Sequence, residues 1–189
     1  MNNYKYKTGL YVGRFQPLHM GHTQIIDKML DECKTVVVAI GSAQESGTER
    51  NPLSFELREE LIYEVYWEWI DNGGLIVLPI NDRQTYSDDP TWGDYLLNNV
   101  YEQCGLRPDV IYEGEEDART HWYDNYDIPV IKVSRKTCPI SGTELRNIIL
   151  NDYKISARVY LHFHNHIYYD LIRKEIQNAA VNAKCNPMD

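Results

Sequence analysis

Two histidines, an arginine, a proline and two glycines crowd the stretch GRFQPLHMGH, Gly13 to His22, directly after a short apolar run. Gly13 lets the chain turn off that run with its backbone close to a ligand, and Gly21 permits close approach before a helix expected to begin near His22. A helix N-terminus presents backbone N–H groups that attract anions. His19 and His22 would bond phosphate oxygens there, and Arg14 would add a fixed positive charge. The stretch therefore predicts a phosphate-binding site.

The same residues also have a plainer interpretation, as the polar residues of a loop together with a metal-like histidine pair. H-x-x-H without a third ligand is a poor metal site, so we expect no metal held by the protein itself. Neither the P-loop pattern G-x-x-x-x-G-K-[ST] nor G-x-G-x-x-G occurs in the chain. A phosphate site here would be of another kind.

A second stretch with the same character lies far downstream, in ISGTELR from Ile140 to Arg146. Ser141 can cap a helix, Gly142 and Thr143 lead into it, and Arg146 lies one turn inside. Alone, such a helix start is more often purely structural. Two of them at the ends of strands in one small α/β domain favour anion binding over the purely structural interpretation.

The elements that must position these residues are strands and helices, which are expected to alternate along the chain. The run TVVVAI is typical of a strand buried on both faces of a parallel sheet. Alternation predicts an α/β domain with a parallel sheet of about five strands flanked by helices, plus a C-terminal helix. Ligands of such sheets bind at the carboxyl ends of the strands, where GRFQPLHMGH falls. We expect strands at Thr8–Val12, Thr35–Ile40, Leu75–Ile80, Asp109–Tyr112 and Pro129–Val133, and helices at His22–Cys33, Ser54–Ile70, Trp92–Cys104, Thr143–Leu150 and Ser156–Ala183.

Length and charge narrow the classes of function. The 189 residues predict a single domain, with the motifs in a core at 8–150 and a helical tail at 151–189. A net charge of −9 argues against a nucleic-acid partner but leaves room for a small basic cleft. The longest apolar run, Val36 to Ile40, is too short for a membrane span. Four scattered cysteines and no signal peptide predict reduced thiols in a cytoplasmic protein, which we further expect to be a homo-oligomer.

The two stretches together resemble the H-x-G-H and I-S-x-T-x-x-R motifs of the nucleotidyltransferase superfamily, and most of all the archaeal-type nicotinamide-nucleotide adenylyltransferases. GSAQES at Gly41–Ser46, the run Arg50-Asn51-Pro52 and Arg58 reinforce the resemblance, which spans about the first three quarters of the chain. Cytidylyltransferases look instead like G-T-F-D-x-x-H-x-G-H with R-T-x-G-I-S-T. Gly142 in place of a second serine fits the nicotinamide branch.

The resemblance implies a Rossmann-like fold and a reaction in which ATP and nicotinamide mononucleotide give NAD and pyrophosphate. The 5′-phosphate of the mononucleotide would attack the α-phosphate of ATP directly and in line. It implies catalytic roles for His22, His19 and Arg146, and a Mg²⁺ ion held mainly by the ATP phosphates. The ATP-binding residues implied are Gly13, Arg14, Phe15, His19, Gly21, His22, Arg50, Ser141, Gly142, Thr143 and Arg146.

The acceptor nucleotide needs a place for a flat, cationic ring. The resemblance assigns Asp82 and Trp92, in the segment NDRQTYSDDPTW, to binding of nicotinamide mononucleotide. An aromatic face suits a cationic pyridinium. Alternatively, Trp92 simply starts a helix and packs on the core. Its neighbours Asp88, Asp89 and Pro90 indicate an exposed loop and favour the pocket.

Three segments depart from the family pattern. Tyr112-Glu113-Gly114-Glu115 stands where the family often has Y-S-G-N, so an amide contact there is expected to be lost. SRKTCP differs in spacing, and Arg135 and Lys136 receive no role. In the tail, His162 and His166 are four apart on an expected helix, where packing is favoured over metal binding.

Two rival functions stay open. A regulatory domain could bind NAD or ATP without turnover, although such a domain would be expected to lose one of His19, His22 and Arg146. An enzyme of the same kind could use another acceptor, such as nicotinate mononucleotide, phosphopantetheine or a flavin nucleotide, because the phosphate motifs do not select the acceptor.

Overall fold

The computed structural model describes residues 4–83, 91–115, 122–134 and 138–185. Across these ranges, no helix combines the length and apolar character that crossing a membrane requires. The strands are β1 (Tyr6–Gly13), β2 (Cys33–Ile40), β3 (Leu75–Pro79), β4 (Val110–Gly114) and β5 (Val130–Val133), and the helices are α1 (Met20–Glu32), α2 (Phe55–Asp71), α3 (Trp92–Cys104), α4 (Gly142–Leu150), α5 (Lys154–Tyr160), the 3₁₀ helix η1 (Phe163–Tyr168) and α6 (Tyr169–Cys185).

The described residues form a parallel five-stranded sheet in the order β3-β2-β1-β4-β5, which confirms the predicted α/β fold. In the register, Leu10 of β1 lies opposite Val37 on one side and Ile111 on the other. The order reverses direction at β1, because the chain builds outward to β3 and then returns to place β4 on the other side of β1. In open parallel sheets the ligand crevice lies at such a reversal, outside the carboxyl ends of the strands.

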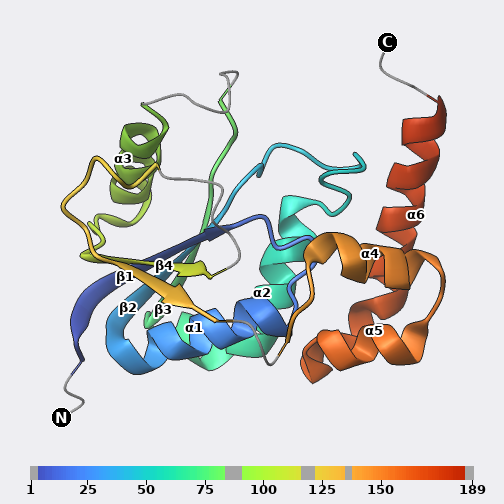
Figure 1. Ribbon diagram of the computed structural model, residues 1–189, viewed down its shortest axis with the longest axis horizontal. Coiled ribbons are helices and arrows are strands. Elements are labelled where there is room, and N and C mark those ends of the chain that lie inside the picture. Colours follow the sequence, from blue (N-terminus) through green and yellow to red (C-terminus); the bar gives the residue numbers. More distant parts are fainter. Residues whose placement is uncertain (1–3, 84–90, 116–121, 135–137, 186–189) are drawn as a thin grey trace.

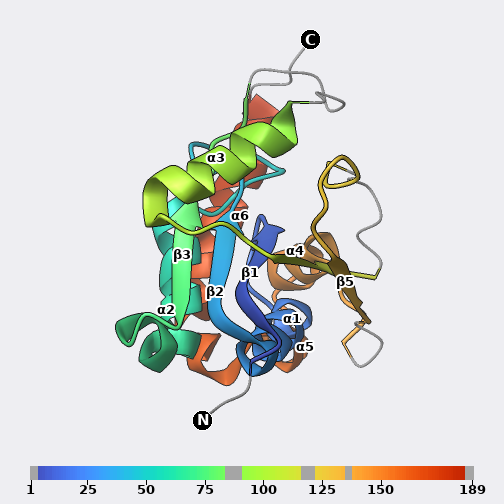
Figure 2. The same ribbon diagram turned by 90° about the vertical axis from the view of Figure 1, so that its left-hand side faces the viewer.

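The side chains of the central strands alternate between two cores. Tyr11, Val36 and Val38 face the larger core, which α1 and α2 cover, whereas Leu10 and Val37 face a smaller core under α3. Figures 1 and 2 show α3 on one face of the sheet and α1 and α2 on the other, with α4, α5 and α6 grouped at one side. The two-sided burial of β2 is what its β-branched run predicts.

The tail departs from the single helix expected over Ser156–Ala183. It forms α5, η1 and α6 in succession, because the backbone becomes extended at Leu161 and His162 starts a new helical turn. The side chain of His162 accepts the N–H of His164, a local bond that competes with continuing α5. Asn165, fully buried, donates its amide to the carbonyl of Leu61 and so fixes η1 against α2.

Candidate active site

The two histidines of GRFQPLHMGH lie together at the start of α1. His19 is the N-cap, and its Nδ1 accepts the N–H of Gly21 at 3.1 Å. Nδ1 of His22 accepts the N–H of His19 at 3.3 Å. The rings stack with centroids 3.7 Å apart and are only 1% and 9% exposed, respectively. The pair is thus locked by the backbone of the helix that it caps.

These hydrogen bonds decide which ring nitrogen can donate. A nitrogen that accepts an N–H carries no proton, so the neutral forms of His19 and His22 hold their hydrogen on Nε2. The Nε2–H edge of each imidazole is therefore the donating edge, suited to a phosphate oxygen. The ring of Phe15, with its centroid 4.8 Å from that of His22, supports the second histidine from the core side.

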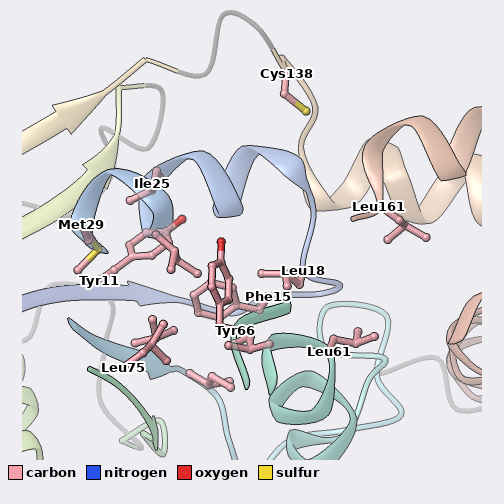
Figure 3. Packing of buried hydrophobic residues seen from close by; sticks show 14 of the residues in the cluster. Tyr11, Phe15, Leu18, Ile25, Met29, Leu61, Tyr66, Leu75, Cys138 and Leu161 are labelled. Carbon is pink, nitrogen blue, oxygen red and sulfur yellow. The ribbon is translucent and has the colours of Figure 1, made fainter. Parts of the chain in front are cut away.

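The loop before the histidines is anchored in the core. Phe15 has a positive φ of 51°, and its side chain is 1% exposed. If Phe15 contacts ATP as predicted, it must do so through its main chain, because its ring is buried. Figure 3 shows Phe15 among Tyr11, Leu18 and Tyr66. A Cβ at Gly13 would lie 3.0 Å from the Phe15 ring, so this ring packing requires a glycine at the end of β1.

The second predicted stretch meets the first one in space. Ser141 caps α4 by accepting the N–H of Glu144 at 3.2 Å. Arg146 donates to the carbonyl oxygen of Gln16 at 2.9 Å, across 130 residues of sequence, and to Oγ1 of Thr143 at 3.1 Å. A Cβ on Gly142 would lie 3.2 Å from that same carbonyl oxygen. The helix start at α4 is thus pressed against the loop that leads into α1.

Three guanidinium groups gather where the two stretches meet. Desolvation and the neighbouring charge of Arg50 lower the pKa of Arg14. Burial and the charge of Arg14 lower the pKa of Arg146. Neighbouring carboxylates oppose both shifts, Asp82 and Glu45 at Arg14 and Glu49 at Arg146. A cluster of cations on a chain of net charge −9 is a focused site for a multiply charged anion.

Arg58 holds the site together, a role that its place in a helix did not reveal from the sequence. Its guanidinium is fully buried and donates to the carbonyl oxygens of Arg14, Gly41, Ser42 and Ser54 at 2.8–3.1 Å. Burial lowers its pKa to about 10. One side chain therefore ties the loops after β1 and β2 to the start of α2.

Asp82 lies at the carboxyl edge of the sheet, after β3, as its assignment to the acceptor requires. Ser42 donates its hydroxyl to Oδ2 of Asp82 at 2.6 Å, and the side chain of Gln44 accepts the Asp82 N–H at 2.9 Å. Ser42 itself has a positive φ of 50°. The GSAQES stretch, singled out only by resemblance, thus orients the aspartate.

Trp92 is the first residue of α3 and is half-buried. Its ring packs on the smaller core and meets Trp122 edge to face, with centroids 5.5 Å apart. The indole therefore packs on the core as the alternative expected, and its role in binding nicotinamide mononucleotide stays a prediction. Asp88, Asp89 and Pro90 lie outside the described residues.

Three segments of the sequence depart from the family pattern, and the structure describes most of their residues. Glu113 is buried and accepts the hydroxyl of Tyr123 at 2.7 Å, so this carboxylate stands fixed where the family pattern has a serine. Arg135 and Lys136 lie outside the described residues. The expectation of His162 and His166 on one continuous helix is wrong: His162 caps η1, and Nε2 of His166 lies 2.9 Å from the carbonyl oxygen of Arg158. Among the described residues, no three His, Cys, Asp or Glu side chains are grouped to hold a metal.

A parallel sheet with two joined helix starts beyond its strands is the arrangement of a Rossmann-like α/β domain. Comparison with known proteins is more specific. Residues 10–148 match the model of the family described as cytidylyltransferase-like, and the chain belongs to that family. The match confirms the resemblance inferred from the two motifs.

Named relatives agree with this assignment. The chain is 41% identical over 146 residues to nicotinamide-nucleotide adenylyltransferase of Pyrococcus furiosus. The alignment covers 74% of this chain and 71% of the relative. It is 31% identical over 145 residues, with the same two shares covered, to the protein of the same name from Thermococcus onnurineus. These relatives make the chain a nucleotidyltransferase.

A solved structure supports the fold. A bifunctional NMN adenylyltransferase/ADP ribose pyrophosphatase from Francisella tularensis, complexed with AMP and a manganese ion, superposes with a TM-score of 0.71 at 24% identity. The alignment covers 95% of this chain and 53% of that one, so this chain spans about half the length of the Francisella protein. At this identity the likeness establishes the arrangement of the sheet and helices.

Proposed function

We propose that this protein transfers AMP from ATP to the 5′-phosphate of nicotinamide mononucleotide, forming NAD and releasing pyrophosphate. The observation that carries the proposal is the contact from Arg146 to Gln16, which joins the two helix starts into one cation-lined site. One long, highly charged ligand such as a triphosphate spans both helix starts, whereas a single phosphate needs only one. The names of the relatives from Pyrococcus and Thermococcus support the same reaction.

Positioning and charge stabilisation supply the catalysis in this scheme, because in-line phosphoryl transfer needs no covalent intermediate. His22 donates from Nε2 to the α-phosphate, where the attacking phosphate oxygen forms its bond as the bond to pyrophosphate breaks. His19 donates to phosphate oxygens that are already charged before the reaction. Arg146 and the N–H groups at the start of α4 hold the β- and γ-phosphates and then the leaving pyrophosphate, assisted by Arg14 and Arg50.

A divalent cation, expected to be Mg²⁺, fits the site as a partner of the nucleotide. Arg146 reaches from α4 to the loop before α1, where the triphosphate is proposed to bind. The ion would be held by phosphate oxygens and water rather than by side chains. When bound, it neutralises phosphate charge.

The acceptor is proposed to bind beside Trp92 and Asp82. The accessible part of the Trp92 indole offers a face to the cationic nicotinamide ring. Asp82 is held by Ser42 and Gln44, so its carboxylate is presented in one orientation. A fixed carboxylate near a cationic ring favours the pyridinium electrostatically.

The test is an assay of the purified protein with ATP, Mg²⁺ and a panel of mononucleotides: nicotinamide mononucleotide, nicotinate mononucleotide and a flavin mononucleotide. Pyrophosphate release and dinucleotide formation are measured together. We expect NAD from nicotinamide mononucleotide and no product from the flavin. If ATP or NAD binds tightly but no pyridine mononucleotide yields pyrophosphate, the protein is a sensor and the proposal fails.

A further inference from the structure

The last helix, α6, lies outside the residues matched by the family but reaches the proposed ATP site. In Figures 1 and 2 it stands beside the loop that follows β2, residues 41–54, which we name the Arg50 loop. Two contacts join them. Glu175 accepts the N–H of Ser54 through Oε2 at 3.1 Å, and Asn182 lies beside Gly47, where a Cβ would be in ordinary van der Waals distance, 3.8 Å, of its Nδ2.

The residue that Glu175 contacts, Ser54, lies where several parts of the proposed ATP site are joined. Ser54 caps α2, and its carbonyl oxygen accepts from Nε of Arg58 at 3.1 Å. The neighbouring residue, Leu53, has both backbone groups bonded to the side chain of Gln16, at 2.9 and 3.0 Å. Residues 53 and 54 therefore connect the Arg50 loop, the loop before α1 and the buried guanidinium. Glu175 adds α6 to that junction.

Charge adds to the geometry. Burial lowers the pKa of Arg58, and the carboxylates of Glu56, Asp82 and, to the smallest extent, Glu175 oppose this lowering. A buried cation bonded only to carbonyl oxygens benefits from a nearby anion, because carbonyl dipoles compensate its charge only in part. Glu175 thus stabilises both the N–H at the start of α2 and the guanidinium that organises the loops.

We infer that α6 is part of the support of the ATP site, with Glu175 as a positioning residue that fixes the Arg50 loop. That ATP is the ligand of this site rests on the proposed function. Without the contact, the orientation of Ser54 and of the preceding loop is no longer fixed from the C-terminal side. The Arg50 loop, which carries the proposed phosphate contact Arg50, is then less well held at its end next to α2. Trp92 packs on the smaller core and against Trp122, on the α3 face of the sheet, so the proposed acceptor site is expected to be unaffected.

The experiment compares Glu175→Ala, Glu175→Gln and the control Gln177→Ala, an exposed residue of the same helix. ATP affinity is measured by titration, and KM is measured for ATP and for nicotinamide mononucleotide. We expect Glu175→Ala to weaken ATP by about two- to twelvefold, the scale of one typical intramolecular hydrogen bond. The KM of the mononucleotide should change less than about twofold. Glu175→Gln, which retains an accepting oxygen, should recover most of the loss, and Gln177→Ala should match the wild type.

Two results would overturn the inference: unchanged ATP affinity in Glu175→Ala, or equal weakening of both substrates. If the alanine variant does not fold, Glu175→Asp gives the same comparison, because it keeps the charge but withdraws the oxygen by one methylene. Glu175→Asp should then weaken ATP selectively, and wild-type affinity in it would equally overturn the inference. If the wild type binds ATP but forms no NAD, the proposed function fails, while the titration still decides the role of Glu175.

Discussion

Replacing Arg58 with methionine is expected to destabilise the protein strongly and to abolish ATP binding. Methionine keeps much of the aliphatic volume but donates no hydrogen bond. Four bonds to carbonyl oxygens are lost, those to Arg14, Gly41, Ser42 and Ser54. The loops after β1 and β2 would then lose their common anchor.

The magnitude follows from two opposing terms. A hydrogen bond to a charged group contributes about 1.5–3 kcal/mol net, so the four bonds together would exceed about 6 kcal/mol if they were independent. Removing the arginine also removes the penalty for burying its charge, which amounts to several kcal/mol. We therefore expect a net loss of about 3–5 kcal/mol in the free energy of unfolding, comparable to the loss seen when one partner of a buried ion pair is removed. That is a large share of a typical stability of about 5–15 kcal/mol.

Urea denaturation followed by circular dichroism measures this loss, and a titration with ATP measures binding in the folded baseline. Arg158→Met is the matched control, since its side chain is exposed, and it should stay within about 0.5 kcal/mol of the wild type. If Arg58→Met lies within about 1 kcal/mol of the wild type and still binds ATP, the anchoring role is refuted.

Three further results are expected. Trp92→Ala should weaken nicotinamide mononucleotide by about two- to thirtyfold while leaving ATP titrations unchanged, because a cation on an aromatic face contributes about 0.5–2 kcal/mol. Gly142→Ala should lower ATP affinity with little change in urea unfolding, since its Cβ would press on the carbonyl of Gln16 at 3.2 Å. Although burial raises the pKa of Glu32, hydrogen bonds from two lysines and a tyrosine outweigh it and lower the pKa to about 2 from 4.5. This carboxylate therefore adds stability above pH 4.5 that is lost as the pH falls toward 2, and Glu32→Gln should remove roughly 3 kcal/mol of that pH dependence in denaturation curves.

A different result would contradict each of these three predictions. Equal weakening of both nucleotides by Trp92→Ala, or loss of folding, would identify the indole as core alone. Wild-type ATP affinity in Gly142→Ala would mean that the contact between α4 and the loop before α1 tolerates a side chain. An unchanged slope of stability with pH in Glu32→Gln would show that other carboxylates dominate acid unfolding.

Much of the fold was predictable because local periodicity carries it. The expected strands and the first four helices agree with the structure to within a few residues, and Ser54 and Ser141 cap helices as their residue types favour. The prediction of one continuous helix in the tail failed for two reasons. The side chain of His162 accepts the N–H of His164 and so competes with continuing α5, and Asn165 is bonded to the carbonyl of Leu61 in α2.

The contacts that assemble the site were less accessible to sequence reasoning. The motifs named His19, His22 and Arg146, but the bond from Arg146 to Gln16 depends on how the strands are ordered, which periodicity does not encode. The resemblance drew attention to Arg58 but gave it no role, and helical periodicity treats it as one more charged residue. Only the folded chain shows that it is fully buried.

The most direct measurement of the account is the turnover of His22→Ala beside His19→Ala, with ATP affinity determined separately by titration. His22 is proposed to donate where charge develops as the bond to pyrophosphate breaks. Its loss should therefore lower kcat by about 10²–10³ while changing ATP affinity little. His19→Ala should affect binding and rate more evenly, because its phosphates are charged before the reaction. If His22→Ala keeps more than about a tenth of the wild-type turnover, the catalytic role of the stacked histidine pair is contradicted.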